Sequence, residues 1–116
     1  MCYEIELPWY NPKLNPNKRP HWAVKAKLKK KQRADAYYIA KAAGNPPVYD
    51  MYNLKITFHP PGDYGYDIDN SIASIKGAID GIADAWGVND KNFRYDGSDF
   101  GEVVENGKII IEISRK

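Results

Sequence analysis

The sequence holds little cysteine and histidine and contains no long hydrophobic run. A single cysteine, Cys2, cannot form an internal disulfide and is compatible with a reducing cytoplasm. The histidines, His21 and His59, lie far apart, so neither is indicated as a metal ligand. No apolar run approaches membrane-spanning length, and the first four residues do not begin a signal peptide. A Gly-rich phosphate cradle is also missing, which disfavours a hydrolase of free nucleotides.

The length of 116 residues predicts one domain over residues 1–116, with room for one modest core. The net charge of +2 hides a strong segregation of charge along the chain. Residues 13–33 hold nine of the seventeen Lys and Arg residues and no acid, whereas residues 63–105 hold ten of the fifteen acids. A basic arm beside an acidic pocket is the arrangement expected of a metal-dependent enzyme that acts on a polyanion.

Periodicity and turn signals predict an α+β fold of two helices packed on one face of a four- to five-stranded mixed sheet. Alternating or β-rich runs predict strands, and runs without Gly or Pro, or with a helical apolar stripe, predict helices. The Asn106-Gly107 pair predicts a C-terminal β-hairpin over 102–113, whose Ile109, Ile111 and Ile113 face the helices. The expected order β-α-β-α-β-β is strand 3–7, helix 21–43, strand 52–58, helix 67–86 and the two strands of the hairpin, and a short strand over 91–95 would be the fifth.

The second predicted helix begins with a pair of acids and is followed by a third. Asp67 and Asp69 lie at its start, where exposed N–H groups favour negative charge, and Asp90 comes one short turn after the C-cap Gly87. Three carboxylates that a short fold-back gathers would repel unless a cation joins them. Hard oxygen ligands in that number suit Mg²⁺ or Mn²⁺. The alternative, which stays open, is a capping pair plus a solvated loop acid.

Two basic segments precede this motif. The Pro-rich loop 8–20 combines cations with Trp9 and Tyr10, which could stack on nucleotides or simply cover the core. The helix after it places Val24, Leu28, Ile39 and Ala42 on one side and most of its cations on the other. A basic helix face can be merely solvated, but six cations without an acid favour a surface that contacts phosphates. The predicted DNA-binding residues are Lys13, Lys18, Arg19, Lys25, Lys29, Lys30 and Arg33.

Taken together, these motifs resemble the RusA family of Holliday-junction resolvases. The resemblance rests on Asp67-Ile-Asp69-Asn70, on Ile-Lys-Gly-Ala-Ile-Asp-Gly-Ile at 75–82, on Gly-Val-Asn-Asp at 87–90, and on Asn-Lys-Arg-Pro-His-Trp at 17–22. It covers most of the chain. Some family members place the helix lysine one turn nearer the acidic motif, and many carry two adjacent acids where this chain has Asn89 and Asp90.

The resemblance implies a Mg²⁺-dependent endodeoxyribonuclease, with Mn²⁺ as a substitute metal, that resolves four-way DNA junctions by paired symmetric nicks. It assigns the metal to Asp67, Asp69 and Asp90 and a catalytic role to Lys76. Asp80, one turn after Lys76, would position that lysine, and Asn70 would support the motif. The implied protein is a cytoplasmic homodimer of prokaryotic or phage origin that binds branched DNA and no membrane. The alternative of another class is a nucleic-acid binding module without catalysis, in which the acids are only caps.

Overall fold

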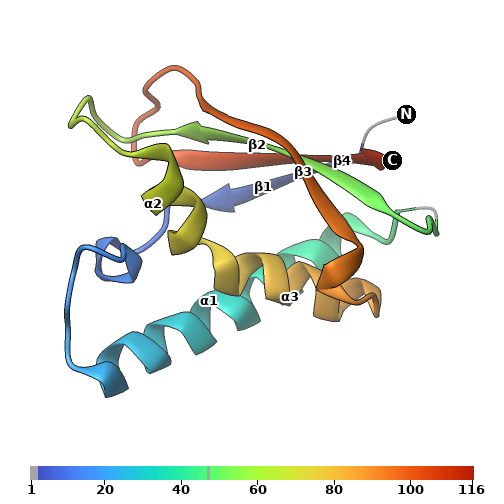
Figure 1. The fold of residues 1–116 in the computed structure, drawn as a ribbon, viewed down its shortest axis with the longest axis horizontal. Helices are drawn as coiled ribbons and strands as arrows, with labels where there is room; N and C mark the ends of the chain where they lie inside the picture. Colours follow the sequence, from blue (N-terminus) through green and yellow to red (C-terminus); the bar gives the residue numbers. More distant parts are fainter. Residues whose placement is uncertain (1–2, 47) are drawn as a thin grey trace.

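The computed structural model describes residues 3–46 and 48–116. It confirms an α+β fold in which the helices lie on one face of a four-stranded mixed sheet (Figure 1). In chain order the elements are β1 (Tyr3–Pro8), the 3₁₀ turn η1 (Pro12–Leu14), α1 (Trp22–Ala43), β2 (Tyr52–His59), α2 (Ile68–Ser74), α3 (Lys76–Trp86), the 3₁₀ turn η2 (Asp90–Asn92), β3 (Phe93–Phe100) and β4 (Lys108–Arg115).

The strands lie in the order β1-β4-β2-β3. β4 pairs antiparallel with both β1 and β2, whereas β2 and β3 run parallel. Parallel neighbours need a long crossover, and α2 and α3 together provide it. The strand expected at 91–95 is therefore the start of a longer strand, 93–100, which is paired along β2.

The predicted C-terminal hairpin is wrong, because β3 and β4 lie on opposite sides of β2. Asn106 and Gly107 do adopt turn conformations, with φ of 66° and 70°. No strand precedes that turn, however. The N–H of Gly101 donates to the carbonyl oxygen of Phe58 (2.8 Å), so the segment after β3 follows the end of β2 before the chain turns into β4. Asn106 and Gly107 thus predict the turn correctly, but they do not predict which strand pairs with β4.

The core lies between the sheet and the helices. Ile109, Ile111 and Ile113 are at most 1% exposed, which confirms the face predicted for β4. A fully buried isoleucine contributes roughly 1.5–3 kcal/mol relative to an exposed one. The strands, α3 and the residue between α2 and α3 supply further fully buried side chains, namely Ile5, Leu54, Ile56, Phe58, Ile75, Ile79 and Ile82.

The helix predicted over 67–86 is broken at Ile75, whose φ and ψ are −112° and 13°. Just before the break, the Ser74 hydroxyl donates to the carbonyl oxygen of Asn70 (2.6 Å), a back-bonding arrangement that bends helices. The Ser74 carbonyl oxygen accepts a hydrogen bond from Gln32 Nε2 on α1 (2.9 Å). A side chain of the neighbouring helix thus stabilises the break.

Two glycines allow α1 and α3 to pack with their backbones close together. A Cβ atom on Gly81 would overlap the carbonyl oxygen of Arg33, and one on Gly77 would lie 3.0 Å from that of Lys29. The contact side of α1 therefore needs small residues, and its buried residues are Ala36 and Ala40. The apolar side predicted for α1 is wrong in part, since its member Val24 is 40% exposed.

Replacing Gly81 by Ala should destabilise the protein by about 1–3 kcal/mol, because the added methyl group overlaps the α1 backbone. Helix propensity alone predicts the opposite sign, since Ala is the better helix former. Gly77→Ala is the matched comparison and should cost less, because its closest contact is the end of the flexible Gln32 side chain. Urea unfolding of both variants measures the difference. A Gly81→Ala protein as stable as the wild type would contradict this packing.

Candidate functional site

The acidic motif lies at the start of α2. Asp67 is the N-cap residue, and its Oδ1 accepts a hydrogen bond from the N–H of Asn70 (3.0 Å). Asp69 lies in the first turn, and both aspartates are exposed. The capping role considered from the sequence is therefore real for Asp67. It occupies one oxygen of that carboxylate, so it does not by itself exclude a second role. Asn70 supports the motif in this way, because its backbone N–H donates the hydrogen bond that holds the Asp67 carboxylate.

Lys76 joins two of the predicted site residues. Its Nζ donates to Asp80 Oδ1 (2.8 Å) and to Asp90 Oδ2 (2.6 Å). The Asp80 contact is the i,i+4 pair expected along α3. Asp90 comes from η2, beyond the end of α3, so only the folded chain brings it to Lys76. The Asp80 side chain is 22% exposed, whereas those of Lys76 and Asp90 are 45% and 43% exposed.

The electrostatics of this cluster keep Lys76 and Asp90 charged. Burial alone would lower the pKa of the Lys76 ammonium, but hydrogen bonds to Asp80 and Asp90 and their negative charges outweigh it and raise that pKa. The Lys76 hydrogen bond and charge lower the pKa of the Asp90 carboxyl. Lys76 is thus a permanent cation and hydrogen-bond donor, and it cannot serve as a base.

A second ion pair borders the same region. Arg33 of α1 forms a bidentate salt bridge with Asp84 of α3. Its Nε donates to Asp84 Oδ2 (2.6 Å), and its Nη2 donates to Asp84 Oδ1 (2.9 Å). The Asp84 hydrogen bond raises the pKa of Arg33, and Asp80 and Asp90 add to this by charge. The two pairs meet at an open hollow of about 370 Å³, which is lined by Arg33, Asp80, Ala83, Asp84, Val88, Asn89 and Asp90.

The metal prediction can be compared with this geometry. Within residues 3–46 and 48–116, no three His, Cys, Asp or Glu residues form a group that could hold a metal ion. Asp67, Asp69 and Asp90 are therefore not a preformed three-carboxylate cage. Mg²⁺ is commonly bound by only one or two carboxylates together with waters and substrate phosphates. The exposed carboxylates of Asp67 and Asp69, separated by one residue, fit that mode of binding.

The predicted basic residues lie at the surface. All are exposed except Lys25, which is half-buried. The sequence pattern suggested that Lys29 and Arg33 lie on the outer face of α1, but they do not. The Lys29 side chain lies beside Gly77 of α3, and Arg33 contacts Asp84, so both border the candidate site. His21 is the N-cap of α1, and its Nδ1 accepts from the N–H of Ala23, as expected of a residue at the helix start.

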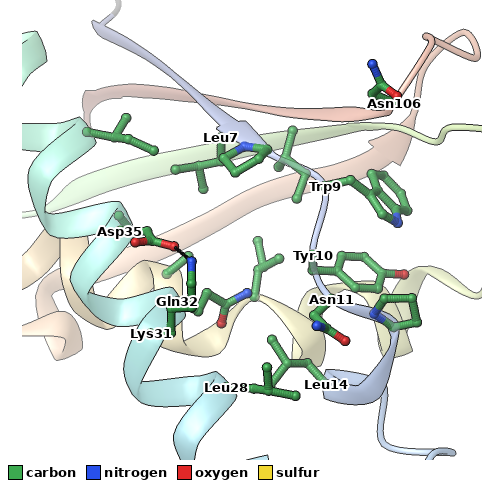
Figure 2. Close-up of a pocket in the computed structure, with 17 residues that line it drawn as sticks. Leu7, Trp9, Tyr10, Asn11, Leu14, Leu28, Lys31, Gln32, Asp35 and Asn106 are labelled. Atoms are coloured by element: carbon green, nitrogen blue, oxygen red, sulfur yellow. Dashed lines mark hydrogen bonds and ion pairs between the residues drawn. The ribbon is translucent and has the colours of Figure 1, made fainter.

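Trp9 and Tyr10 belong to the core rather than to a nucleotide-binding surface. Tyr10 is 5% exposed, and its hydroxyl shares a hydrogen bond with the buried Ser71 hydroxyl (3.0 Å). Trp9 packs against the rings of Tyr10, Phe58 and Tyr66. Figure 2 shows both rings beside a mainly apolar pocket of about 480 Å³ between the β1–η1 segment and α1. The covering role is therefore the correct interpretation of these two aromatic residues.

Comparison with known proteins identifies a bacterial relative. No family model matches the chain. A protein of Xylella fastidiosa (strain Temecula1 / ATCC 700964), named "Uncharacterized protein", is 37% identical over 114 residues, which is 95% of this chain and 74% of the relative. The chain belongs to the family of that Xylella protein. A bacterial relative agrees with the predicted prokaryotic or phage origin. The likeness to RusA stays a prediction, because neither finding names that family.

Membrane insertion of a helix is not indicated. Over the described ranges, 3–46 and 48–116, none of the helices combines the length and apolar character needed to cross a membrane.

Two site residues were missed at the sequence level. Asp84 was not recognised as the partner of Arg33, although it lies one turn after Asp80 on the same helix. Tyr95 of β3 is half-exposed. Partial burial raises the pKa of its hydroxyl, and the charges of Lys76, Asp80 and Asp90 lie close enough to affect that pKa as well. The Asp80-x-x-x-Asp84 spacing was a usable signal for the first, whereas nothing local marks Tyr95.

Replacing Lys76 by Gln should raise the pKa of Asp90 toward its ordinary value, because the ammonium that lowers it is lost. In the wild type, the pair stabilises the fold above the unfolded-state pKa of the carboxyl, near 4, and this stabilisation is lost as the pH falls through the lower folded-state pKa. An NMR titration of the Asp90 carboxyl carbon measures the shift.

Lys91→Gln is the matched control for this titration, because Lys91 affects Asp90 through its backbone N–H, which Gln retains. An Asp90 pKa that is the same in Lys76→Gln and in the wild type would show that the two side chains do not pair in solution.

Proposed function

We propose that the protein is a Mg²⁺-dependent endodeoxyribonuclease of the RusA type that cuts branched DNA. The observation that carries the proposal is the Lys76 ammonium, held between Asp80 and Asp90 at the start of α3, directly after the short helix that begins with Asp67 and Asp69. Lys76, Asp80 and Asp90 are thus in contact, and Asp67 and Asp69 begin the helix that precedes them.

Lys76 is equipped to bind a phosphate oxygen. An ammonium has three N–H donors, and the carboxylates of Asp80 and Asp90 each take one. The third can donate to a non-bridging oxygen of a phosphodiester. The raised pKa of Lys76 keeps the donor charged, so it would offset the negative charge that builds up on the phosphorus centre.

The surrounding charges fit a polyanion. The hollow beside Lys76 carries three carboxylates, and an isolated acidic hollow would repel DNA. Arg33 lines it from α1, and Lys29 of the same helix lies beside Gly77, the neighbour of Lys76 in the chain. The exposed Lys13, Lys18 and Arg19 lie on the preceding loop. This basic surface supplies the attraction, because neutralising phosphates releases the counterions condensed on them.

In the proposed reaction, water attacks the phosphorus in line, the bond from phosphorus to the leaving oxygen breaks, and that oxygen takes up a proton. The residues that would hold Mg²⁺ are Asp67 and Asp69, with Asp90 as the third carboxylate, and the bound ion would supply Lewis acidity to the attacking water and positive charge to the phosphate oxygens. Asp80, the more buried partner, would hold Lys76 in place when DNA approaches.

A four-way junction needs two symmetric cuts, so we further propose a twofold-symmetric homodimer that acts in the cytoplasm. Tyr49 and Met51, just before β2, and Ile110 on β4 are half-buried and are the candidates for the dimer interface.

A second candidate is a nucleic-acid binding module without catalysis. Two observations favour it: Asp67 already acts as a helix cap, and the described residues contain no preformed three-carboxylate group. In that case the acids would serve only the fold, and the basic surface would be the functional one.

Asp69→Asn and Asp90→Asn should each lower cleavage of a synthetic four-way junction by about a hundredfold or more, while junction binding stays nearly unchanged. Both residues are exposed, so the variants should fold. The assay follows nicking on denaturing gels with Mg²⁺ and with EDTA. Asp63→Asn, an exposed acid four residues before the motif, is the matched control and should cleave normally. Binding of the junction by the wild type with no Mg²⁺-dependent nicking would favour the binding module.

A further inference from the structure

The most exposed aromatic residue of α1 stands at its first position. Trp22 is 76% exposed, although tryptophan is usually largely buried. Its ring lies beside that of the N-cap His21, with centroids 5.5 Å apart and planes tilted by 32°. In Figure 1 this end of α1 projects away from the sheet. Packing in the core therefore does not explain why a tryptophan occupies this exposed position.

Trp22 is aligned with three cations. Positions 22, 25, 29 and 33 fall within about 80° of one another around a helix, because steps of three and four residues return to nearly the same side. We call the side chains Trp22, Lys25, Lys29 and Arg33 the basic stripe. Its far end, Arg33, borders the hollow that contains Asp80 and Asp90. At 1.5 Å per residue, the stripe is roughly 16 Å long.

The composition around Trp22 selects its partner. The exposed residues near it are mostly cations and alanines, and no acid occurs from residue 13 to residue 34. A second copy of the same stripe would be repelled by like charge. A lipid surface would need a broad apolar face, whereas this end of α1 offers only Trp22 and Val24 as exposed large apolar side chains. A cationic stripe with one aromatic ring fits a nucleic-acid strand, whose phosphates pair with the cations while a base stacks on the ring.

We propose that Trp22 stacks on an unpaired base of branched DNA, and that Lys25 and Lys29 bind the adjoining phosphates and direct that strand toward Lys76. The inference rests on the proposed function, and it adds a binding role that the sequence motifs did not assign. The close packing of α1 on α3 matters for this path. The glycine contacts at positions 77 and 81 fix the direction of the stripe relative to the site.

Fluorescence anisotropy in EDTA tests the proposal with three labelled DNAs of matched sequence: a four-way junction, a single strand and a blunt duplex. Trp22→Ala should weaken binding of the junction and the single strand by about fivefold to a hundredfold, the value of one stacked base. Binding of the duplex, whose bases are already stacked, should change by less than about twofold. Trp22→Phe, which keeps a ring, should recover most of the affinity.

Salt titrations separate the ring from the cations. Trp22→Ala should leave the dependence of affinity on salt unchanged, because stacking releases no counterions. Lys25→Ala with Lys29→Ala should reduce the slope by about two, or one per lost phosphate contact. Tyr38→Ala is the matched control. Tyr38 lies on the same helix, is 70% exposed, and points about 160° away from Trp22 by helix geometry. It should bind all three DNAs as the wild type does.

Several results would overturn the inference. One is equal affinity of Trp22→Ala and Tyr38→Ala for the junction, and another is an equal loss on all three DNAs. A dimer that dissociates in Trp22→Ala during sedimentation without DNA would assign the ring to a second copy. Binding to anionic phosphatidylglycerol vesicles that is lost in Trp22→Ala would assign it to lipid. If the wild type binds none of the DNAs, the proposed function fails together with the inference. If the wild type binds the junction but Trp22→Ala binds it equally well, only the inference fails.

Discussion

The close contact between α1 and α3 is the constraint on which the rest of the site depends. Gly77 and Gly81 leave room for α1, and a side chain at Gly81 would overlap the α1 backbone. The contact places Arg33 against Asp84 and brings Lys29 beside the start of α3. A basic helix and an acidic helix would attract each other in many orientations. The two glycines select one of these, so that cations and carboxylates share one rim.

The break at Ile75 has a complementary effect. One continuous helix would carry the acidic motif and Lys76 along a single axis, whereas the break gives α2 and α3 separate directions. Gln32 of α1 donates to the Ser74 carbonyl at this point, so the basic helix also stabilises the junction between the two short helices. Lys76 then lies at the beginning of α3, where it reaches Asp80 on its own helix and Asp90 after it.

Much of the fold could be predicted from local pattern, because burial repeats with the period of each element. The alternation of Ile109, Ile111 and Ile113 gave the buried face of β4 correctly. Pairing between distant segments could not be predicted in this way, since Asn106 and Gly107 are turn residues whether or not a strand precedes them. In the site, the Lys76–Asp80 spacing is local and was predicted, while the contact of Lys76 with Asp90 depends on how η2 folds back. The roles of Asp67, Asp69 and Asp90 toward a metal remain predictions.

Calorimetric melting with Mg²⁺ and with EDTA tests the central claim most directly, namely that the carboxylates of α2 and η2 form one metal-binding site. An ion that binds only the folded chain stabilises it by RT ln(1 + [Mg²⁺]/Kd), which is about 1–3 kcal/mol at ten to a hundred times Kd. The account predicts that the wild type melts several degrees higher in Mg²⁺. Asp69→Asn should lose most of that increment, and Asp63→Asn should keep it. Wild-type protein that melts at the same temperature in both buffers would contradict the account.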